Sequence, residues 1–276
     1  MLPNLSTWLV TGATSGIGQA ITQALCARGD RVIAVGRRGQ ALQTLKARYE
    51  AQLCVCQADV NQPEGRAKII AAAAAEPQLA GVVHAAGVNQ FGAFSEQSDT
   101  QIAELIHTNV IATLQLVRGL LPVLARQPHA QLLLVGSTFG ALGYAGYASY
   151  CASKFALRGF AQALRRELAD TAINVQYLAP RATRTAMNPA PVNAMNAALG
   201  VHMDTPEQVA QAAIKQLLNG QARLQLGWPE GFFVLLNAVL PGLVDRALRK
   251  QLPTIQGFAR GAANVAAKQP SVRSLS

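Results

Sequence analysis

Short apolar runs alternate with longer amphipathic segments along most of the chain. Runs that favour β-strands lie at residues 8–11, 31–35, 53–58, 82–85, 131–135, 173–178 and 223–226. Between them, apolar positions recur at helical spacing over residues 17–28, 40–49, 64–75, 100–121 and 149–169. Strands that are apolar on both faces are typical of a parallel sheet covered by helices on each side. The pattern therefore predicts an α/β fold with a doubly wound parallel sheet flanked by helices.

No repeat or polar linker divides the chain, and its 276 residues, 50% of them hydrophobic, suffice for one core. We therefore predict a single domain over residues 1–228, followed by a C-terminal helical extension and tail over residues 229–276. Residues 187–205 break the alternation and are rich in Ala, Asn, Met and Pro. Flexible Met side chains suit a substrate lid over an apolar pocket, and a plain surface connection fits the composition equally well.

The C-terminal extension is apolar on nearly all sides over residues 231–252 and ends in basic side chains. An asparagine and a proline interrupt this run, which is too short to span a bilayer. Two interpretations of this run fit the sequence equally well. The run makes a peripheral contact with anionic lipid or forms a greasy substrate entrance, or it is buried against the protein's own core or a second copy. From residue 254 the tail is small, polar and basic, and we expect it to be loosely ordered.

The net charge of +10 and the pI near 10.0 are compatible with nucleic acid, anionic lipid or an anionic cofactor. Because the Lys and Arg residues are scattered, without interleaved aromatic residues, we predict no nucleic-acid partner. The N-terminus lacks a basic region followed by an apolar run, so no secretory signal is expected. The four cysteines show no metal or disulfide spacing. A cytoplasmic protein with reduced thiols and no metal site is therefore expected.

A glycine-rich turn joins the first strand to the first helix. It contains Gly12, Thr14, Ser15, Gly16, Ile17 and Gly18. Glycines allow a tight turn and a close approach of the backbone to a pyrophosphate, and the helix N-terminus offers unpaired N–H groups and a positive dipole end. Glycines alone indicate no more than a tight turn. Their position at the first strand–helix junction favours a dinucleotide site.

Arg37 and Arg38 follow the second strand, where the adenosine ribose of a dinucleotide would lie. A site for NAD usually offers an acidic residue here, whereas a guanidinium can bind a 2′-phosphate through paired charge-assisted hydrogen bonds. The two residues therefore predict NADP(H), with two solvated arginines as the alternative. Asp59 and Val60 follow the third strand, where they would meet the adenine.

The candidate catalytic residues are Asn109, Ser137, Tyr150 and Lys154. Tyr150 and Lys154 are spaced to share one helix face. An ammonium about 4 Å from a phenol would lower the pKa of the phenol by at most about three units, toward neutrality. Such a pair can give a proton to a carbonyl oxygen or remove one from an alcohol. Ser137 can hold the substrate oxygen, and Asn109 either holds a water that relays protons to Lys154 or is an ordinary helix-surface residue.

These motifs, in this order, resemble those of the short-chain dehydrogenase/reductase (SDR) family over residues 6–227. The resemblance implies a Rossmann-type domain in which Tyr150 is the general acid/base, Lys154 lowers its pKa and grips the nicotinamide ribose, and Ser137 positions the substrate. The expected contacts with NADP(H) are Gly12, Thr14, Ser15, Gly16, Ile17, Gly18, Arg37, Arg38, Asp59, Val60, Ala85, Ala86, Gly87, Asn109, Tyr150, Lys154, Pro180, Thr183 and Thr185.

Two positions depart from the family pattern. His84 stands where the family has an asparagine, and we expect it to brace the sheet through hydrogen bonds rather than to act in catalysis. After the sixth strand, Arg181 replaces the glycine of the family's Pro-Gly-x-x-x-Thr motif. Thr185 can still bind the carboxamide, while Arg181 either changes the loop or reaches an anionic group of the substrate or cofactor.

The sequence thus predicts an oxidoreductase that acts on CH–OH or C=O groups of a lipophilic small molecule with NADP(H). The alternative is a non-catalytic NADP(H)-binding redox sensor of the same fold. The resemblance also implies a homodimer or homotetramer formed by the helices at residues 100–121 and 149–169. The residues that favour a lipophilic substrate, and that could equally be packing residues, are Phe91, Phe94, Phe139, Leu142, Tyr144 and Tyr147.

Overall fold

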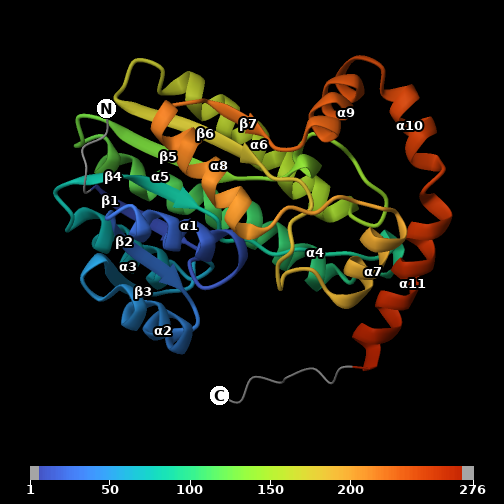
Figure 1. The fold of residues 1–276 in the computed structure, drawn as a ribbon, viewed down its shortest axis with the longest axis horizontal. Helices are drawn as coiled ribbons and strands as arrows, with labels where there is room; N and C mark the ends of the chain where they lie inside the picture. Colours follow the sequence, from blue (N-terminus) through green and yellow to red (C-terminus); the bar gives the residue numbers. More distant parts are fainter. Residues whose placement is uncertain (1–5, 269–276) are drawn as a thin grey trace.

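Within residues 6–268, seven parallel strands form one sheet in the order β3-β2-β1-β4-β5-β6-β7 (Figure 1). The computed structural model describes residues 6–268, with side chains to residue 260. Each predicted strand is present, and the predicted parallel sheet is confirmed. The strands are β1 (Thr7–Thr11), β2 (Arg31–Gly36), β3 (Leu53–Gln57), β4 (Leu79–His84), β5 (Ala130–Val135), β6 (Ile173–Ala179) and β7 (Arg223–Gln225).

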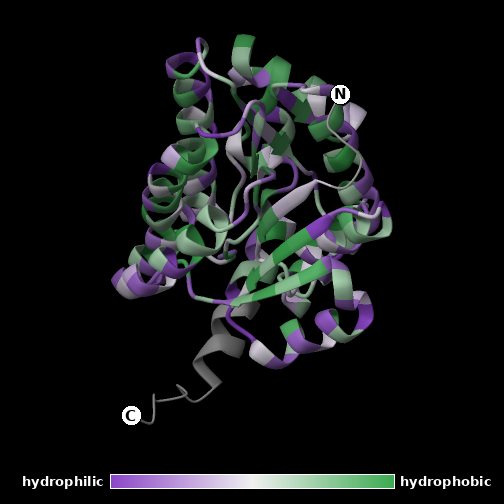
Figure 2. Cartoon of the chain, turned by 90° about the vertical axis from the view of Figure 1, so that its left-hand side faces the viewer, coloured by the Kyte–Doolittle hydropathy of each residue, from purple (hydrophilic) through white to green (hydrophobic). Residues whose placement is uncertain are grey.

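Helices cover both faces of the sheet, each burying an apolar side against the strands. In Figure 2 the strands are coloured mainly as hydrophobic, while the helices alternate between the two ends of the scale. The doubly wound fold in a single domain is therefore confirmed. One face carries α1 (Gly16–Ala27), α2 (Gly39–Tyr49) and α8 (Pro206–Asn219), and the other α3 (Pro63–Ala74), α5 (Ala112–Leu124) and α6 (Ala148–Glu167).

The sheet changes its winding direction between β1 and β4. From β1 the chain continues outward through β2 to β3, and from β4 it continues the opposite way to β7. In open α/β sheets the crevice at such a switch point, outside the carboxyl ends of the strands, is where ligands bind. The glycine turn after β1 and the segment after β4 both lie at this position, so the fold itself locates a candidate site.

The helix predicted over residues 100–121 is interrupted, so that part of the prediction is wrong. α4 (Asp99–Ile106) is separated from α5 by the π-helical turn η3 (His107–Ile111). Asn109 lies in this turn and is buried, with its amide bonded to the backbone of Val88 after β4. Such turns inside helices are frequent at functional sites. Shorter 3₁₀ turns lie at η1 (Glu50–Gln52), η2 (Phe94–Glu96) and η4 (Thr138–Gly140).

The C-terminal extension folds into successive helices that run along one side of the molecule (Figure 1). The tail expected to be loosely ordered from residue 254 is helical to residue 268, because Ile255 is buried together with Val192 and Met195. Residues 269–276 lie outside the described residues. The helices of the extension are α9 (Trp228–Val239), α10 (Pro241–Arg249) and α11 (Leu252–Lys268), and Val192 and Met195 belong to α7 (Ala190–Ala198).

The apolar run over residues 231–252 is divided between α9 and α10 rather than forming one helix. Val234 and Val244 pack against the segment after β5. Other large apolar side chains of α9 remain exposed, so the run is buried on one side only. Among residues 6–268, no helix has the length and apolar character needed to cross a membrane. The exposed side chains of this face are Trp228, Phe232, Leu235 and Val239.

Candidate active site

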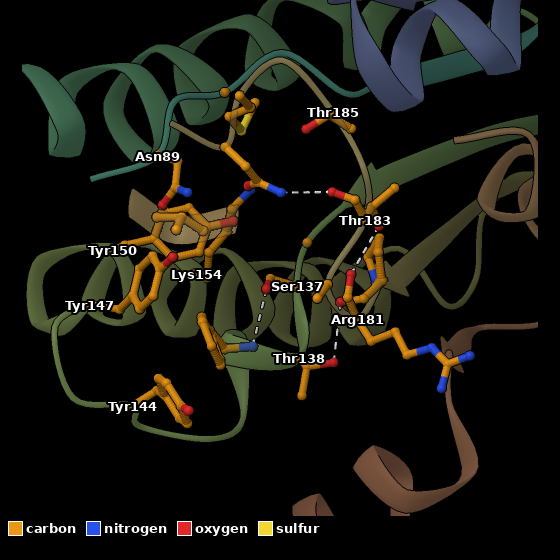
Figure 3. Close-up of a pocket in the computed structure, with 18 of the residues that line it drawn as sticks. Asn89, Ser137, Thr138, Tyr144, Tyr147, Tyr150, Lys154, Arg181, Thr183 and Thr185 are labelled. Atoms are coloured by element: carbon orange, nitrogen blue, oxygen red, sulfur yellow. Dashed lines mark hydrogen bonds between the residues drawn. The ribbon is translucent and has the colours of Figure 1, made fainter. Parts of the chain in front are cut away.

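A cavity of about 400 Å³ lies at the carboxyl ends of β1, β4, β5 and β6 (Figure 3). Most of the predicted site residues line it, and the rest lie outside its lining. The lining members are Gly12, Ser15, Gly16, Ile17, Gly18, Ala85, Ala86, Gly87, Ser137, Tyr150, Lys154, Pro180, Thr183 and Thr185. The others are Thr14, Arg37, Arg38, Asp59, Val60 and Asn109.

The glycine turn is shaped for close backbone approach. Gly12 has φ of +69°, and a Cβ there would lie 2.9 Å from the Ala86 nitrogen. A Cβ on Gly18 would lie 2.4 Å from the Gly12 carbonyl oxygen. The Ser15 side chain makes no hydrogen bond that caps α1, whereas Thr205 caps α8 in a complete capping box. An uncapped helix start behind a tight glycine turn fits the pyrophosphate of a dinucleotide.

Two guanidinium groups flank the turn at the end of β2. Arg37 is 67% exposed, and its Nη1 lies 3.9 Å from Asp59 Oδ2. Arg38 donates a hydrogen bond from Nη2 to the Thr14 carbonyl oxygen. Gly36 leaves room for this arrangement, since a Cβ there would lie 2.8 Å from Thr14 Cγ2. The structure thus brings together the residues predicted for the adenosine end and fits a phosphorylated ribose there.

Tyr150, Lys154 and Ser137 meet at the cavity wall (Figure 3). α6 carries Tyr150 and Lys154 one turn apart, and the Lys154 Nζ lies 5.7 Å from the centroid of the Tyr150 ring. This ammonium also donates to the Val135 carbonyl oxygen at 3.3 Å. The Ser137 Oγ accepts a hydrogen bond from the Phe139 N–H at 3.1 Å and interacts with the Tyr150 hydroxyl.

Burial is the main cause of the pKa shifts of Tyr150 and Lys154. It raises the pKa of Tyr150 above its ordinary value, and the hydrogen bond with Ser137 lowers that pKa only in part. Burial also lowers the pKa of Lys154 to about 8. Burial dominates the Tyr150 pKa in this arrangement, so the phenol is protonated at neutral pH. That Lys154 brings this pKa toward neutrality stays a prediction.

Asn109 holds the segment after β4 against α6. Its Oδ1 accepts from the Val88 N–H and its Nδ2 donates to the Val88 carbonyl oxygen, both at 2.9 Å. Nδ2 also donates to Ser153 Oγ at 3.0 Å. A Cβ on Gly87 would lie 3.1 Å from Asn109 Oδ1 and 3.7 Å from Lys154 Nζ, so the amide and the ammonium border the same space. The alternative of a helix-surface residue is wrong, because the side chain is buried.

His84 braces the sheet, as predicted. Its Nδ1 lies 3.0 Å from Thr11 Oγ1, and its Nε2 lies 2.9 Å from Thr113 Oγ1. Burial and, to a smaller extent, the charge of Lys154 lower the pKa of this imidazole to about 3. The neutral ring therefore links β1, β4 and α5 through hydrogen bonds at any pH near neutrality.

The loop after β6 keeps its threonine near the glycine turn but directs Arg181 elsewhere. A Cβ on Gly16 would lie 3.1 Å from Thr185 Cγ2. Arg181 donates to Asp204 Oδ1 at 2.7 Å, which raises the pKa of the guanidinium, and also lies 3.5 Å from Glu230 Oε2. In Figure 3 its side chain extends away from Tyr150. Arg181 therefore contacts two carboxylates of the chain itself, where a contact with an anionic group of the substrate or cofactor was expected.

Aromatic side chains form the other end of the cavity. The Phe139 and Tyr144 rings stack with centroids 5.0 Å apart. Phe94 is 60% exposed and does not line the cavity. Phe91 packs against Tyr147 outside the lining, which agrees with the packing alternative for this residue. The aromatic and apolar lining is confirmed for Phe139, Leu142, Tyr144 and Tyr147.

The C-terminal extension supplies a wall of the cavity, which agrees with the greasy substrate entrance offered as one interpretation of residues 231–252. Gln251 is tied to this wall, since its Oε1 accepts a hydrogen bond from the Tyr144 hydroxyl at 2.7 Å. One signal was present: Glu230 is the only acidic residue between positions 207 and 245, in an otherwise apolar segment. The extension residues that line the cavity are Glu230, Phe233, Ala247, Leu248 and Gln251.

A Rossmann-type sheet with a Ser–Tyr–Lys group beside a glycine turn defines a dinucleotide-dependent class of α/β proteins. A family model described as short chain dehydrogenase matches residues 6–196. The chain belongs to the short-chain dehydrogenase family of oxidoreductases.

Individual relatives agree with this membership. Nodulation protein G of Rhizobium sp. (strain N33) is 34% identical over 183 residues, or 65% of this chain and 74% of that protein. NADP-dependent 3-hydroxy acid dehydrogenase YdfG of Escherichia coli (strain K12) is 33% identical over 174 residues, or 62% and 70%. The structure of a short-chain dehydrogenase from Streptomyces avermitilis matches with a TM-score of 0.75 at 30% identity and covers 93% of this chain and 98% of that one.

Proposed function

We propose that this protein is an NADP(H)-dependent oxidoreductase that reduces the carbonyl group, or oxidises the secondary alcohol, of a lipophilic small molecule. The observation that carries the proposal is the meeting of Ser137, Tyr150 and Lys154 between a glycine turn and an aromatic cavity end. The two arginines after β2 and a relative described as NADP-dependent support NADP(H). The cofactor, when bound, supplies or accepts the hydride.

The chain's own residues transfer the proton and bind the substrate oxygen. Tyr150, protonated at neutral pH, gives its proton to the carbonyl oxygen in reduction and takes it back in oxidation. Ser137 Oγ holds that oxygen next to the phenol. Lys154, charged below a pKa of about 8, stabilises the phenolate that forms and can hold the nicotinamide ribose. Asn109 fixes the segment after β4 beside Lys154.

The apolar end of the cavity favours a lipophilic substrate. Phe139 and Tyr144 line it together with Val192 and Met195 of α7, which supports residues 187–205 as a substrate lid. The test is turnover of a panel of ketones, aldehydes and 3-oxoacyl thioesters with NADPH and with NADH. Faster reduction of the apolar ketones with NADPH is expected. NADPH binding without any turnover would instead favour a redox sensor.

We expect self-association through α5 and α6. The exposed face of α6 includes the small residues Ala152, Ala156, Gly159 and Ala163, and a Cβ on Gly159 would meet nothing within 4 Å. Such a face permits close helix approach. Ala156→Arg should therefore convert a dimer or tetramer to a monomer in light scattering, while Ala47→Arg on exposed α2 should not. A monomer of the unmodified chain at micromolar concentration would contradict the proposal.

We further propose a cytoplasmic protein whose exposed α9 face makes a peripheral contact with anionic lipid. The apolar side chains of this face precede the exposed basic residues of α10, in a chain of net charge +10. Leu235→Glu with Val239→Glu should abolish co-sedimentation with anionic vesicles at low salt. Leu218→Glu, on exposed α8, is the matched control. If the unmodified chain stays in the supernatant, the face packs against a protein or solvent instead.

A further inference from the structure

One basic side chain joins three segments of the cavity wall. Arg181 belongs to the loop after β6, Asp204 ends the segment that contains α7, and Glu230 lies in the first turn of α9. The guanidinium donates to Asp204 Oδ1 at 2.7 Å and lies 3.5 Å from Glu230 Oε2. The three side chains are 17%, 10% and 24% exposed, so solvent screens these pairs only weakly.

The surrounding backbone is shaped for this contact. Gly227 precedes α9 with φ of +83°, and a Cβ there would lie 2.1 Å from Glu230 Oε2 and 2.9 Å from Arg181 Cδ. The Asp204 N–H donates to the Ala182 carbonyl oxygen at 2.9 Å, which fixes the carboxylate beside the loop. Glycine at position 227 therefore provides both the positive φ and the room for the pair.

We propose that Arg181 is a positioning residue whose guanidinium, held between Asp204 and Glu230, fastens α9 to the loop after β6 and so fixes the apolar wall of the substrate pocket. A planar guanidinium can serve two carboxylates at once, which an ammonium does poorly. Phe233 follows Glu230 by one helical turn and lines the cavity, so the Glu230 contact determines where this ring stands. The inference rests on the proposed function, because the pocket is that of the same site.

The charges of the cluster oppose the alternative that Arg181 binds a substrate anion. One guanidinium faces two carboxylates, so the group as a whole carries no free positive charge. An anionic substrate bound at Nη2 would have to displace the Asp204 carboxylate, which accepts from this nitrogen at 2.7 Å. The cluster therefore serves to join segments of the chain, and it favours uncharged substrates in the adjoining cavity.

The kinetic test breaks the contact between the loop and α9. Glu230→Gln keeps the side-chain size and removes the charge, so KM for an apolar ketone should rise about three- to tenfold, as for a partly screened charged pair. The kcat and the Kd for NADPH should change little. In an Arg181→Gln variant, adding Glu230→Gln should cause no further rise in KM, because the ion pair between the two residues is already broken. Asp245→Asn, on exposed α10, removes an equal charge and should leave KM unchanged.

A fluorescence test is independent of turnover. Trp228 is 82% exposed and lies two residues before Glu230, while Trp8, the other tryptophan, is buried. If the contact holds α9, Glu230→Gln and Arg181→Gln should lower the fluorescence anisotropy of Trp228, and Asp245→Asn should not. A Trp228→Phe variant gives the Trp8 background to subtract.

The two readouts separate the inference from the proposed function. Unchanged anisotropy in both Glu230→Gln and Arg181→Gln, or an unchanged KM despite a change in anisotropy, would overturn the positioning role. Absence of ketone turnover in the unmodified chain would overturn the proposed function, and the anisotropy of Trp228 would then decide the structural role of Arg181 alone.

Discussion

Replacing Tyr150 by phenylalanine is expected to reduce kcat for ketone reduction about a hundred- to ten-thousandfold, the contribution of one positioned proton-transfer group. The phenol is buried, interacts with Ser137 and stays protonated at neutral pH, so it is the proposed donor of the proton to the substrate oxygen. Phenylalanine keeps the ring that packs against Phe139 and Tyr147 and removes only the hydroxyl. The Kd for NADPH, measured by fluorescence titration, should therefore change little.

The matched control is Tyr147→Phe. The Tyr147 ring lies 5.9 Å from that of Tyr150 and also lines the cavity, so this substitution removes a neighbouring buried hydroxyl without touching the proposed proton donor. Its kcat should stay close to that of the unmodified chain. If Tyr150→Phe retained activity within about tenfold, another group would have to supply the proton, because general acid catalysis is worth more than that.

The architecture of the domain could be predicted because each of its signals is local. Strands buried on both faces read as continuous apolar runs, and the helices between them show one apolar side. The positions of the site residues could be predicted from local signals of the same kind. Tyr150 and Lys154 share a helix face through their spacing, and Ser137 closely follows a parallel strand whose carboxyl end must open onto the ligand crevice.

The features that escaped the sequence depend on tertiary contacts or on burial. The spacing of Tyr150 and Lys154 predicts their proximity but not their desolvation, which sets the direction of both pKa shifts. Arg181 finds its partners in Asp204 and Glu230, which lie far along the chain on other segments. The π-helical turn around Asn109 likewise depends on a bond to the segment after β4, which no helical periodicity encodes.

Replacing Arg37 and Arg38 together by alanine should remove most of the preference for NADPH over NADH. A guanidinium bound to a phosphate through paired hydrogen bonds contributes about 1.5–3 kcal/mol, or about ten- to a hundredfold in affinity. Both side chains stand at the end of β2, one 3.9 Å from Asp59 and the other bonded to the Thr14 carbonyl oxygen. The Kd for each cofactor, measured by titration, should show the loss for NADPH alone, since NADH lacks the 2′-phosphate.

Arg126→Ala tests whether the loss reflects a specific contact rather than overall charge. Arg126 is exposed and precedes β5, at the edge of the sheet opposite the ligand crevice, so its removal lowers the net charge without altering the adenosine end. It should leave the ratio of the two Kd values unchanged. Salt should weaken NADPH binding to the unmodified chain more than binding to the double variant, because solvent-exposed charge pairs are screened. Equal affinity of the unmodified chain for NADPH and NADH would show that Arg37 and Arg38 are solvated surface residues, and that cofactor choice is not set at the end of β2.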